Sequence, residues 1–504
     1  MKRIFLISLM ACMLTVVIIA AGDTSDTQTE PSSQGDTLFA QGEKEFNASN
    51  FHSAADMFTL AQEKYSTAGD RAAYIRARDM SFLSTNAGTN FPYNRSEIET
   101  EMAQAFPNAS AAQRDAWLDA PMTATLKSEG EVWYFSETIH NVRNHNPSIL
   151  QEENTRAHHT PLYDELIPLI TASWNNGNGT YGAPVTYTGS TVLNIPRENL
   201  PANGTLKVWM PVPIESGSQT NVTILSMEPS QYVQSSTGVG GDIGLVYLEI
   251  PLEEITDPFL NITARYSFVQ HEQRFSIDPA KVLPYNTSSP EYLQYTASSK
   301  NVALTPEIKA TALSIVGNET NPYFQAQKLY WDTITTHPYS HAPHFWLDVT
   351  GIPESQYVLE TGIGDCASQS LYFAALCRSL GIPARATGGY QMIEGSAGTH
   401  IWAEYYLEGY GWIPVDVTAA EGGDASYNAT PDDLHRYKAY YFGSLDPYRF
   451  IIQKNLDLPV IPDAGDAVIP PSGWVQLPKI ACDTCTDNPM TLSFMFSKVT
   501  VTKE

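Results

Sequence analysis

Three residue types that together can carry out nucleophilic catalysis occur in order in the second half of the chain. Cys366 follows a Gly-Asp pair at the expected start of a helix, and His400 and Asp416 follow in two expected strands. The thiolate is the reactive form of cysteine, and a helix N-terminus lowers a thiol's pKa because its unpaired N–H groups favour negative charge. A histidine can take the proton and a carboxylate can fix the imidazole's tautomer. The pattern predicts a Cys366–His400–Asp416 site.

Residues that flank these three are expected to support the site rather than to react. Asp365 precedes the helix as a candidate cap, and Trp402 and Glu404 share a strand face with His400. The oxyanion formed during acyl transfer needs hydrogen-bond donors, and the Cys366 N–H is one candidate. The second donor is expected before the cysteine helix, where three candidates stay open: Tyr339, Trp346 and Gln356.

The spacing of His400 and Asp416 constrains the turn between their strands. Side chains alternate between the two faces of a strand, so a register shift of one residue moves a side chain to the other face. A two-residue loop at Gly409-Tyr410 would place His400 and Asp416 on opposite faces. A three-residue loop, or a bulge near Gly409 or Gly411, would bring them to the same face, and we expect one of these.

Helix and strand patterns place the candidates in an α+β domain over residues 290–455. The cysteine helix is expected to end at Gly381, with Pro383 just beyond it. The predicted elements, in chain order, are helices over 305–315, 322–336 and 366–380, then strands over 384–390, 400–407 and 412–418.

This region resembles the transglutaminase-like superfamily, whose core is papain-like. The resemblance is carried by Asn321-Pro322-Tyr323, Gly364-Asp365-Cys366, Leu380-Gly381-Ile382-Pro383-Ala384-Arg385, His400-Ile401-Trp402-Ala403-Glu404 and Trp412-Ile413-Pro414-Val415-Asp416. It implies Cys366 as nucleophile, His400 as general base and acid, and Asp416 as the residue that orients His400. A β-sandwich often precedes the core in this family.

The remainder of the chain is expected to form separate units. Residues 36–175 show helical patterns, with Gly42, Ala54 and Ala61 spaced as in a single tetratricopeptide-like repeat. Short alternating runs predict a β-sandwich over 183–285. The C-terminal extension, 456–504, holds Cys482-Asp-Thr-Cys485, for which a small disulfide loop is favoured over a zinc site.

The N-terminal segment predicts an exported protein. Residues 1–22 combine basic residues with an apolar run, as in a signal peptide or an uncleaved anchor, and 23–35 read as a linker. Ten Asn-X-Ser/Thr sequons, from Asn47 to Asn428, are compatible with glycosylation. The net charge of −26, from 29 basic and 55 acidic residues, argues against nucleic-acid binding.

These features together predict a secreted or surface-anchored thiol hydrolase, a peptidase or amidase that forms a thioester on Cys366. Two alternatives stay open: amine transfer that cross-links proteins, and a noncatalytic cell-surface interaction protein with a relic core. Taken singly, Cys366, His400 and Asp416 could be a capped helix start, a hydrogen-bonded strand histidine and a strand-end residue. The expected partners are a peptide or protein substrate, with the cell envelope as one source, and a protein at the N-terminal helices. No cofactor or metal is expected, and no membrane contact beyond the N-terminal segment.

Overall fold

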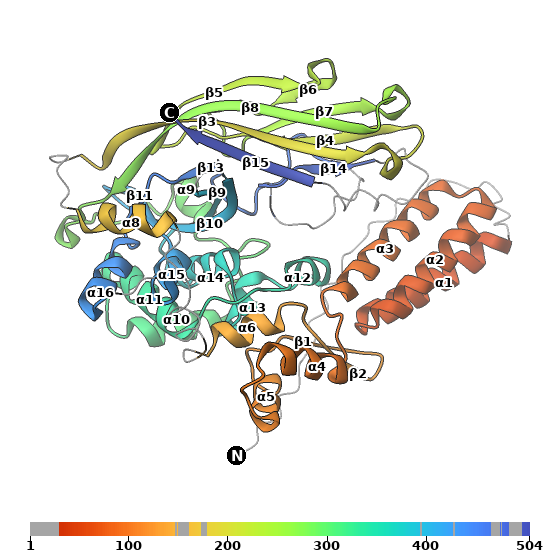
Figure 1. Ribbon diagram of the computed structural model, residues 1–504, viewed down its shortest axis with the longest axis horizontal. Coiled ribbons are helices and arrows are strands. Elements are labelled where there is room, and N and C mark those ends of the chain that lie inside the picture. The colour runs from red at the N-terminus through yellow and green to blue at the C-terminus, as the bar shows by residue number, and fades with distance from the viewer. Residues whose placement is uncertain are drawn as a thin grey trace.

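The computed structural model describes residues 30–146, 149, 161–172, 179–393, 396–426, 429–464, 474, 476–482 and 496–504. A helical N-terminal region, a β-rich region and an α+β core follow one another along the chain (Figure 1). The expected signal segment, 1–22, and Cys485 lie outside the described residues. Within the described residues, no helix is both long and apolar enough to span a membrane.

The N-terminal region begins with three successive packed helices: α1 (Glu30–Asn47), α2 (Phe51–Ala68) and α3 (Arg71–Thr89). Small residues lie where α1 meets α2, since a Cβ at Gly42 would stand 2.7 Å from the Phe58 ring. Residues 30–35, expected in a linker, are helical instead. The reason is packing, because Gly35 lies against the Tyr65 ring and Asp36 accepts a 2.8 Å hydrogen bond from the Tyr65 hydroxyl.

The helical pattern predicted for 36–175 is interrupted by a β-hairpin. Its turn lies at Glu129 and Gly130, which both have positive φ angles, 55° and 83°. Two residues in this conformation form the tight turns that join antiparallel strands, so no helix continues here. The elements after α3 are α4 (Arg95–Ala105), α5 (Ala111–Leu118), β1 (Thr125–Ser128), β2 (Glu131–Tyr134), α6 (Thr138–Asn144) and α8 (Pro161–Thr171).

The β-rich region contains two sheets whose apolar faces share one hydrophobic cluster. One sheet has the order β12-β8-β3-β15, with β5 also pairing β8, and the other has the order β14-β4-β7-β6. The strands are β3 (Tyr181–Pro196), β4 (Thr205–Pro211), β5 (Gln219–Glu228), β6 (Val233–Ser236), β7 (Leu245–Pro251), β8 (Phe259–Arg274), β12 (Ser444–Leu445), β14 (Lys479–Ala481) and β15 (Phe496–Lys503). Short 3₁₀ turns occur at Arg197–Asn199, Ser230–Tyr232, Leu252–Glu254 and Pro279–Lys281.

Two of these strands, β14 and β15, come from the C-terminal extension, which the sequence patterns did not place. They pair with β4 and β3 respectively, so the extension completes both sheets. Cys482, just after β14, is disulfide-bonded, while Cys366 and Cys377 are free. The pairing of Cys482 with Cys485 stays a prediction.

The α+β core holds a four-stranded antiparallel sheet in the order β11-β10-β9-β13, with helices packed against it. Its elements are α9 (Pro290–Tyr295), α10 (Pro306–Val316), α11 (Pro322–Thr336), α12 (His344–Thr350), α13 (Glu354–Thr361), α14 (Cys366–Ser379), β9 (Ala384–Ile393), β10 (Ser396–Leu407), β11 (Gly411–Val415), α15 (Val417–Ser426), α16 (Pro431–Tyr440) and β13 (Arg449–Gln453). The third predicted strand therefore ends at Val415, because α15 begins at Val417.

Helix α14 lies at the centre of the core. Every residue from Ala367 to Arg378 is buried, as expected for a helix packed on several sides. The sheet is closely packed too, since a Cβ at Gly389 would stand 1.9 Å from the Phe450 carbonyl oxygen on β13. Tyr390 and Phe450 also join the cluster of the β-rich region, so the core sheet is fixed between α14 and the sheets of that region (Figure 1).

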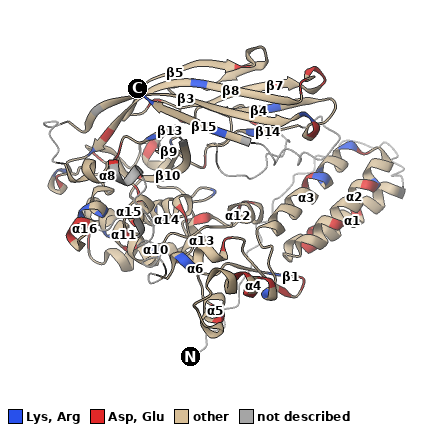
Figure 2. Cartoon of the chain, viewed as in Figure 1, with Lys and Arg blue, Asp and Glu red and all other residues tan. Residues whose placement is uncertain are grey.

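Charged side chains are scattered over the elements in the view of Figure 2, where Lys and Arg gather on no single helix or sheet. Acidic side chains outnumber basic ones, in keeping with the net charge of −26. The most tightly held charges lie instead inside the α+β core, where ion pairs are nearly inaccessible to water.

Candidate active site

The start of α14 holds Cys366 in a capped helix turn. The Asp365 carboxylate accepts hydrogen bonds from the N–H groups of Ala367 (3.0 Å) and Ser368 (3.3 Å). Asp365 is thus the N-cap, as predicted. Among the described residues, the Cys366 N–H has no hydrogen-bond acceptor, so it can donate a hydrogen bond to a ligand. The Cys366 side chain is partly exposed, whereas Cys377 in the same helix is fully buried.

The hairpin of β10 and β11 brings His400 and Asp416 to one face of the sheet. Leu407 pairs with Gly411, so the loop has three residues, as one of the expected arrangements required. Gly409 lies in this loop with a φ of 90°, a conformation that glycine adopts without strain. His400 Nε2 and Asp416 Oδ2 are 2.8 Å apart.

Asp416 is fully buried and bound on both oxygens. Its Oδ1 accepts the Ala419 N–H at 3.0 Å, and its Oδ2 accepts a 2.6 Å hydrogen bond from Arg449 Nη1 in addition to the contact with His400. Burial raises the pKa of Asp416, but the charges of His400 and Arg449 outweigh it and hold this pKa below its ordinary value. Asp416 therefore remains a carboxylate.

Arg449 is a site residue that sequence reasoning missed. It comes from β13, is fully buried, binds both Asp416 and Asp446, and lies 5.1 Å above the Trp402 ring. The only signal in the sequence was an Asp and an Arg three positions apart near an apolar run. Such a pair is ordinarily a surface ion pair, so no pattern marked it as part of the site. Trp402 packs under this arginine and 6.2 Å from the His400 ring.

The thiol of Cys366 is held in its neutral form, contrary to the expectation of a lowered pKa. Burial raises the pKa of Cys366, and the neighbouring Asp365 carboxylate raises it further, while hydrogen bonds from the Ile401 and Ala367 N–H groups oppose them. Burial is the main reason for the difference, and the negative charge of the capping residue next to the sulfur adds to it by offsetting the helix N-terminus. The contact with Ile401 places the sulfur beside the residue that follows His400 in β10.

A second histidine binds the cap of the cysteine helix. His344 Nε2 lies 2.5 Å from Asp365 Oδ2, and His344 Nδ1 lies 2.7 Å from Glu354 Oε1. Carboxylates accept hydrogen bonds and do not donate them, so both ring nitrogens carry protons and His344 is an imidazolium. Burial lowers the pKa of His344, but the two carboxylates overcome it and raise this pKa well above its ordinary value. Ser368 closes the network with a 2.6 Å hydrogen bond to Glu354 Oε2.

The three candidates for the second oxyanion donor lie in different surroundings. Burial raises the pKa of the Tyr339 hydroxyl, and the negative charge of the nearby Asp365 raises it further. Trp346 packs edge-on against Phe91, 5.5 Å away, within a hydrophobic cluster.

The Gln356 side chain faces a different set of residues, since it bonds to Thr305 and Glu360. A supporting role of Gln356 in the site stays a prediction. Glu404 binds Arg385 at 2.7 Å, and Arg385 stacks on Trp412, so Glu404 stabilises the sheet and makes no hydrogen bond to the site among the described residues.

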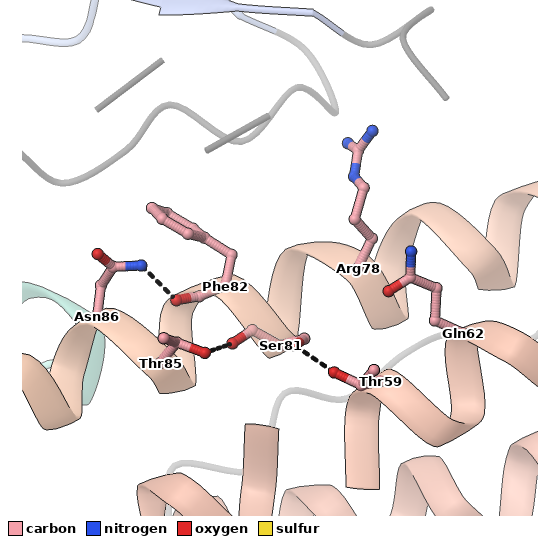
Figure 3. A pocket seen from close by; sticks show the side chains of 7 residues that line it. All are labelled: Thr59, Gln62, Arg78, Ser81, Phe82, Thr85 and Asn86. Atoms are coloured by element: carbon pink, nitrogen blue, oxygen red, sulfur yellow. Dashed lines mark hydrogen bonds between the residues drawn. The ribbon is translucent and has the colours of Figure 1, made fainter. Parts of the chain in front are cut away.

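A pocket between α2 and α3 is separate from these residues (Figure 3). Its walls are mainly hydroxyl and amide side chains, with Ser81 and Thr59 hydrogen-bonded at 2.8 Å. Its one charged lining residue, Arg78, pairs with Asp79 at 2.8 Å. The lining holds no His or carboxylate to activate these hydroxyls and its one charge is paired, so this pocket offers no chemistry of its own.

Comparison with known proteins identifies part of the core. Residues 309–417 match the Transglutaminase-like superfamily. An uncharacterised protein of Haemophilus influenzae is 28% identical over 162 residues, which cover 27% of this chain and 42% of that relative, so the match spans less than half of the relative's length.

Two solved structures are similar at low identity. A proposed cysteine protease from Cytophaga hutchinsonii is 15% identical with a TM-score of 0.37, and the match covers 60% of this chain and 99% of the other. The periplasmic domain of TgpA from Pseudomonas aeruginosa is 13% identical with a TM-score of 0.24, covering 53% and 100%. Likeness at these scores says nothing more about this chain.

Proposed function

Residues 309–417 form a transglutaminase-like core, and we propose that the chain is an exported thiol hydrolase, a peptidase or amidase, that uses Cys366, His400 and Asp416 as its catalytic triad. One observation carries the proposal. His400 in β10 lies 2.8 Å from the buried carboxylate of Asp416, and the next residue of β10, Ile401, contacts the Cys366 sulfur. Because Nε2 faces Asp416, Nδ1 is the nitrogen left for the thiol.

The neutral thiol sets the order of events. His400 Nδ1 removes the proton as the Cys366 sulfur attacks the substrate carbonyl carbon, and the oxyanion that forms accepts a hydrogen bond from the Cys366 N–H. Collapse of this intermediate breaks the C–N bond, and His400 returns the proton to the departing amine. Water then attacks the thioester while His400 takes its proton, and the acid and the free thiol are released.

Asp416 holds the imidazole through both proton transfers. A buried carboxylate stabilises the imidazolium that forms in each one. Arg449 keeps Asp416 ionised, and the same guanidinium also pairs with Asp446. Since two acidic residues flank one arginine, the assembly keeps one unbalanced negative charge until His400 is protonated, which favours proton removal from the thiol.

The test is hydrolysis of a library of short peptide amides by the full chain, with mass spectrometry of the products. We expect release of the amine, loss of at least ~10³-fold in Cys366→Ala and His400→Ala, and retention in the matched control Cys377→Ala. A fluorescent primary amine added to the same reaction reports transfer, since its covalent incorporation into peptides would favour cross-linking. Turnover that survives Cys366→Ala would refute the proposal, and no turnover with any substrate would favour the noncatalytic alternative.

A further inference from the structure

Three potential metal ligands meet where the N-terminal region contacts the core. Glu137 precedes α6, His140 lies one turn further along it, and His341 lies in the loop between α11 and α12. One ligating atom from each falls within 4.8 Å of the other two. His140 Nδ1 and Glu137 Oε2 are already 2.6 Å apart. The cluster is independent of the triad, and no sequence pattern marked it.

The backbone that carries His341 is fixed to α6 by neighbouring side chains. Asn141, which is fully buried, accepts a 2.8 Å hydrogen bond from the His341 N–H and donates one of 3.0 Å to the His341 carbonyl oxygen. His145 and Ser340 lie 2.5 Å apart one turn away. Two segments 200 positions apart are therefore held in a defined register, which pre-organises the three ligand side chains.

The donor set fits a zinc-class ion. Two imidazoles and one carboxylate are the protein ligands of many open tetrahedral zinc sites, where a water molecule takes the fourth position. With bonds of about 2.0–2.2 Å, tetrahedral ligand atoms lie roughly 3.3–3.6 Å apart, so His341 must approach the others by at most roughly 1.5 Å, while the 2.6 Å contact of Glu137 with His140 must lengthen. The His140 side chain is 55% exposed, so it can rotate by that amount without disturbing the core.

We propose that Glu137, His140 and His341 bind a divalent transition-metal ion of the zinc class, with water completing the coordination. An ordinary ion pair between Glu137 and His140 would need no third donor. The position of His341 beside this pair therefore favours a metal site over a simple ion pair. The net charge of −26 favours accumulation of cations near the surface.

Metal binding would fasten α6 to a loop that reaches the candidate active site. In that loop, the Ser340 N–H donates a 2.9 Å hydrogen bond to the Gly364 carbonyl oxygen, two residues before Cys366. Tyr339 lies within electrostatic reach of Cys366. An ion at His341 would therefore restrict the segment that precedes the nucleophile helix.

The test uses the full chain with Cys366→Ala, which removes the thiol as a competing ligand. After chelation and dialysis, Co²⁺ is titrated while the visible absorption of tetrahedral cobalt is followed, and Zn²⁺ is then added as a competitor. We expect about one ion per chain, displacement by zinc, and a higher melting temperature in the loaded protein.

Matched variants locate the ion. His341→Ala and the milder Glu137→Gln should each weaken binding by about tenfold or more, whereas His435→Ala, at an exposed histidine elsewhere, should not change it. Circular dichroism confirms that the variants are folded. Parental affinity for cobalt in Glu137→Gln and His341→Ala, or no cobalt spectrum in the parent protein, would overturn the assignment.

Discussion

Replacing His344 with Gln should uncouple the stability of the nucleophile helix from pH. His344 lies between Asp365 and Glu354 at 2.5 and 2.7 Å, with its side chain 26% exposed. Glutamine keeps a polar side chain but removes the cation, so two largely buried carboxylates lose their counter-ion. Removing one partner of a buried ion pair costs about 3–5 kcal/mol, and this is the loss expected at mildly acidic pH.

The pH dependence follows from the direction of the shift. The pKa of His344 is raised above its ordinary 6.5 in the folded protein, so the contribution is complete below that value and declines as the pH rises toward the folded pKa. In this range the contribution of His344 to the free energy of unfolding falls by about 1.4 kcal/mol per pH unit. The pKa of Asp365 is lowered, so its own contribution is present above about pH 4 and is lost as the pH falls through the folded pKa. The network stabilises most between about pH 4 and 6.5.

Cys377 provides the assay, because it is a fully buried thiol in α14. The protein, in a Cys366→Ala background, is equilibrated in increasing urea at about pH 5.5 and 8.5. At each urea concentration a short pulse of a fast thiol reagent labels exposed Cys377, and mass spectrometry of the Cys377 peptide gives the unfolded fraction. The free energy of unfolding of His344→Gln should be about 3–5 kcal/mol below that of its parent at the lower pH. At the higher pH this difference should shrink by up to about 2.7 kcal/mol. The matched control is His435→Gln. Equal pH dependence in parent and His344→Gln would refute the reasoning.

Three further outcomes are expected. Asp365→Asn keeps a capping side chain but removes the charge beside the sulfur, so the pH profile of Cys366 alkylation should shift to lower pH; an unchanged profile would contradict the electrostatic account. Asp416→Asn should lower peptide-amide turnover by about 10³-fold or more while His400 remains in place, and near-normal turnover would remove Asp416 from the mechanism. Gly389→Ala should destabilise the core sheet, measured by urea denaturation, because its Cβ would stand 1.9 Å from a carbonyl oxygen on the neighbouring strand, and parental stability would contradict that contact.

The parts predicted best from the sequence were those governed by local rules. The cap at Asp365, the helix starting at Cys366 and the three-residue loop that aligns His400 with Asp416 follow from capping preferences and strand alternation. Arg449 could not be found in this way, because its partners depend on how β13 packs against the rest of the sheet. The same holds for His344, whose two carboxylates lie 10 and 21 positions away.

The pKa of Cys366 shows a second limit. The helix N-terminus favours a thiolate, yet the residue that caps the helix brings a negative charge to the same place. Which effect dominates depends on burial, and burial depends on the whole fold. The hairpin over 125–134 was missed for a related reason, since the turn at Glu129-Gly130 determines its structure and neither residue type excludes a helix by itself.

The pairing of β15 with β3 bears on how the protein is made. Thr188 and Glu504, which are hydrogen-bonded, are separated by 316 positions, and the entire α+β core lies between the two strands in the chain. During synthesis, the edge of β3 therefore emerges long before its partner and stays open to wrong partners in the meantime. Contacts this distant also slow folding. We expect the nascent chain to need protection by chaperones until residues 496–503 have been made.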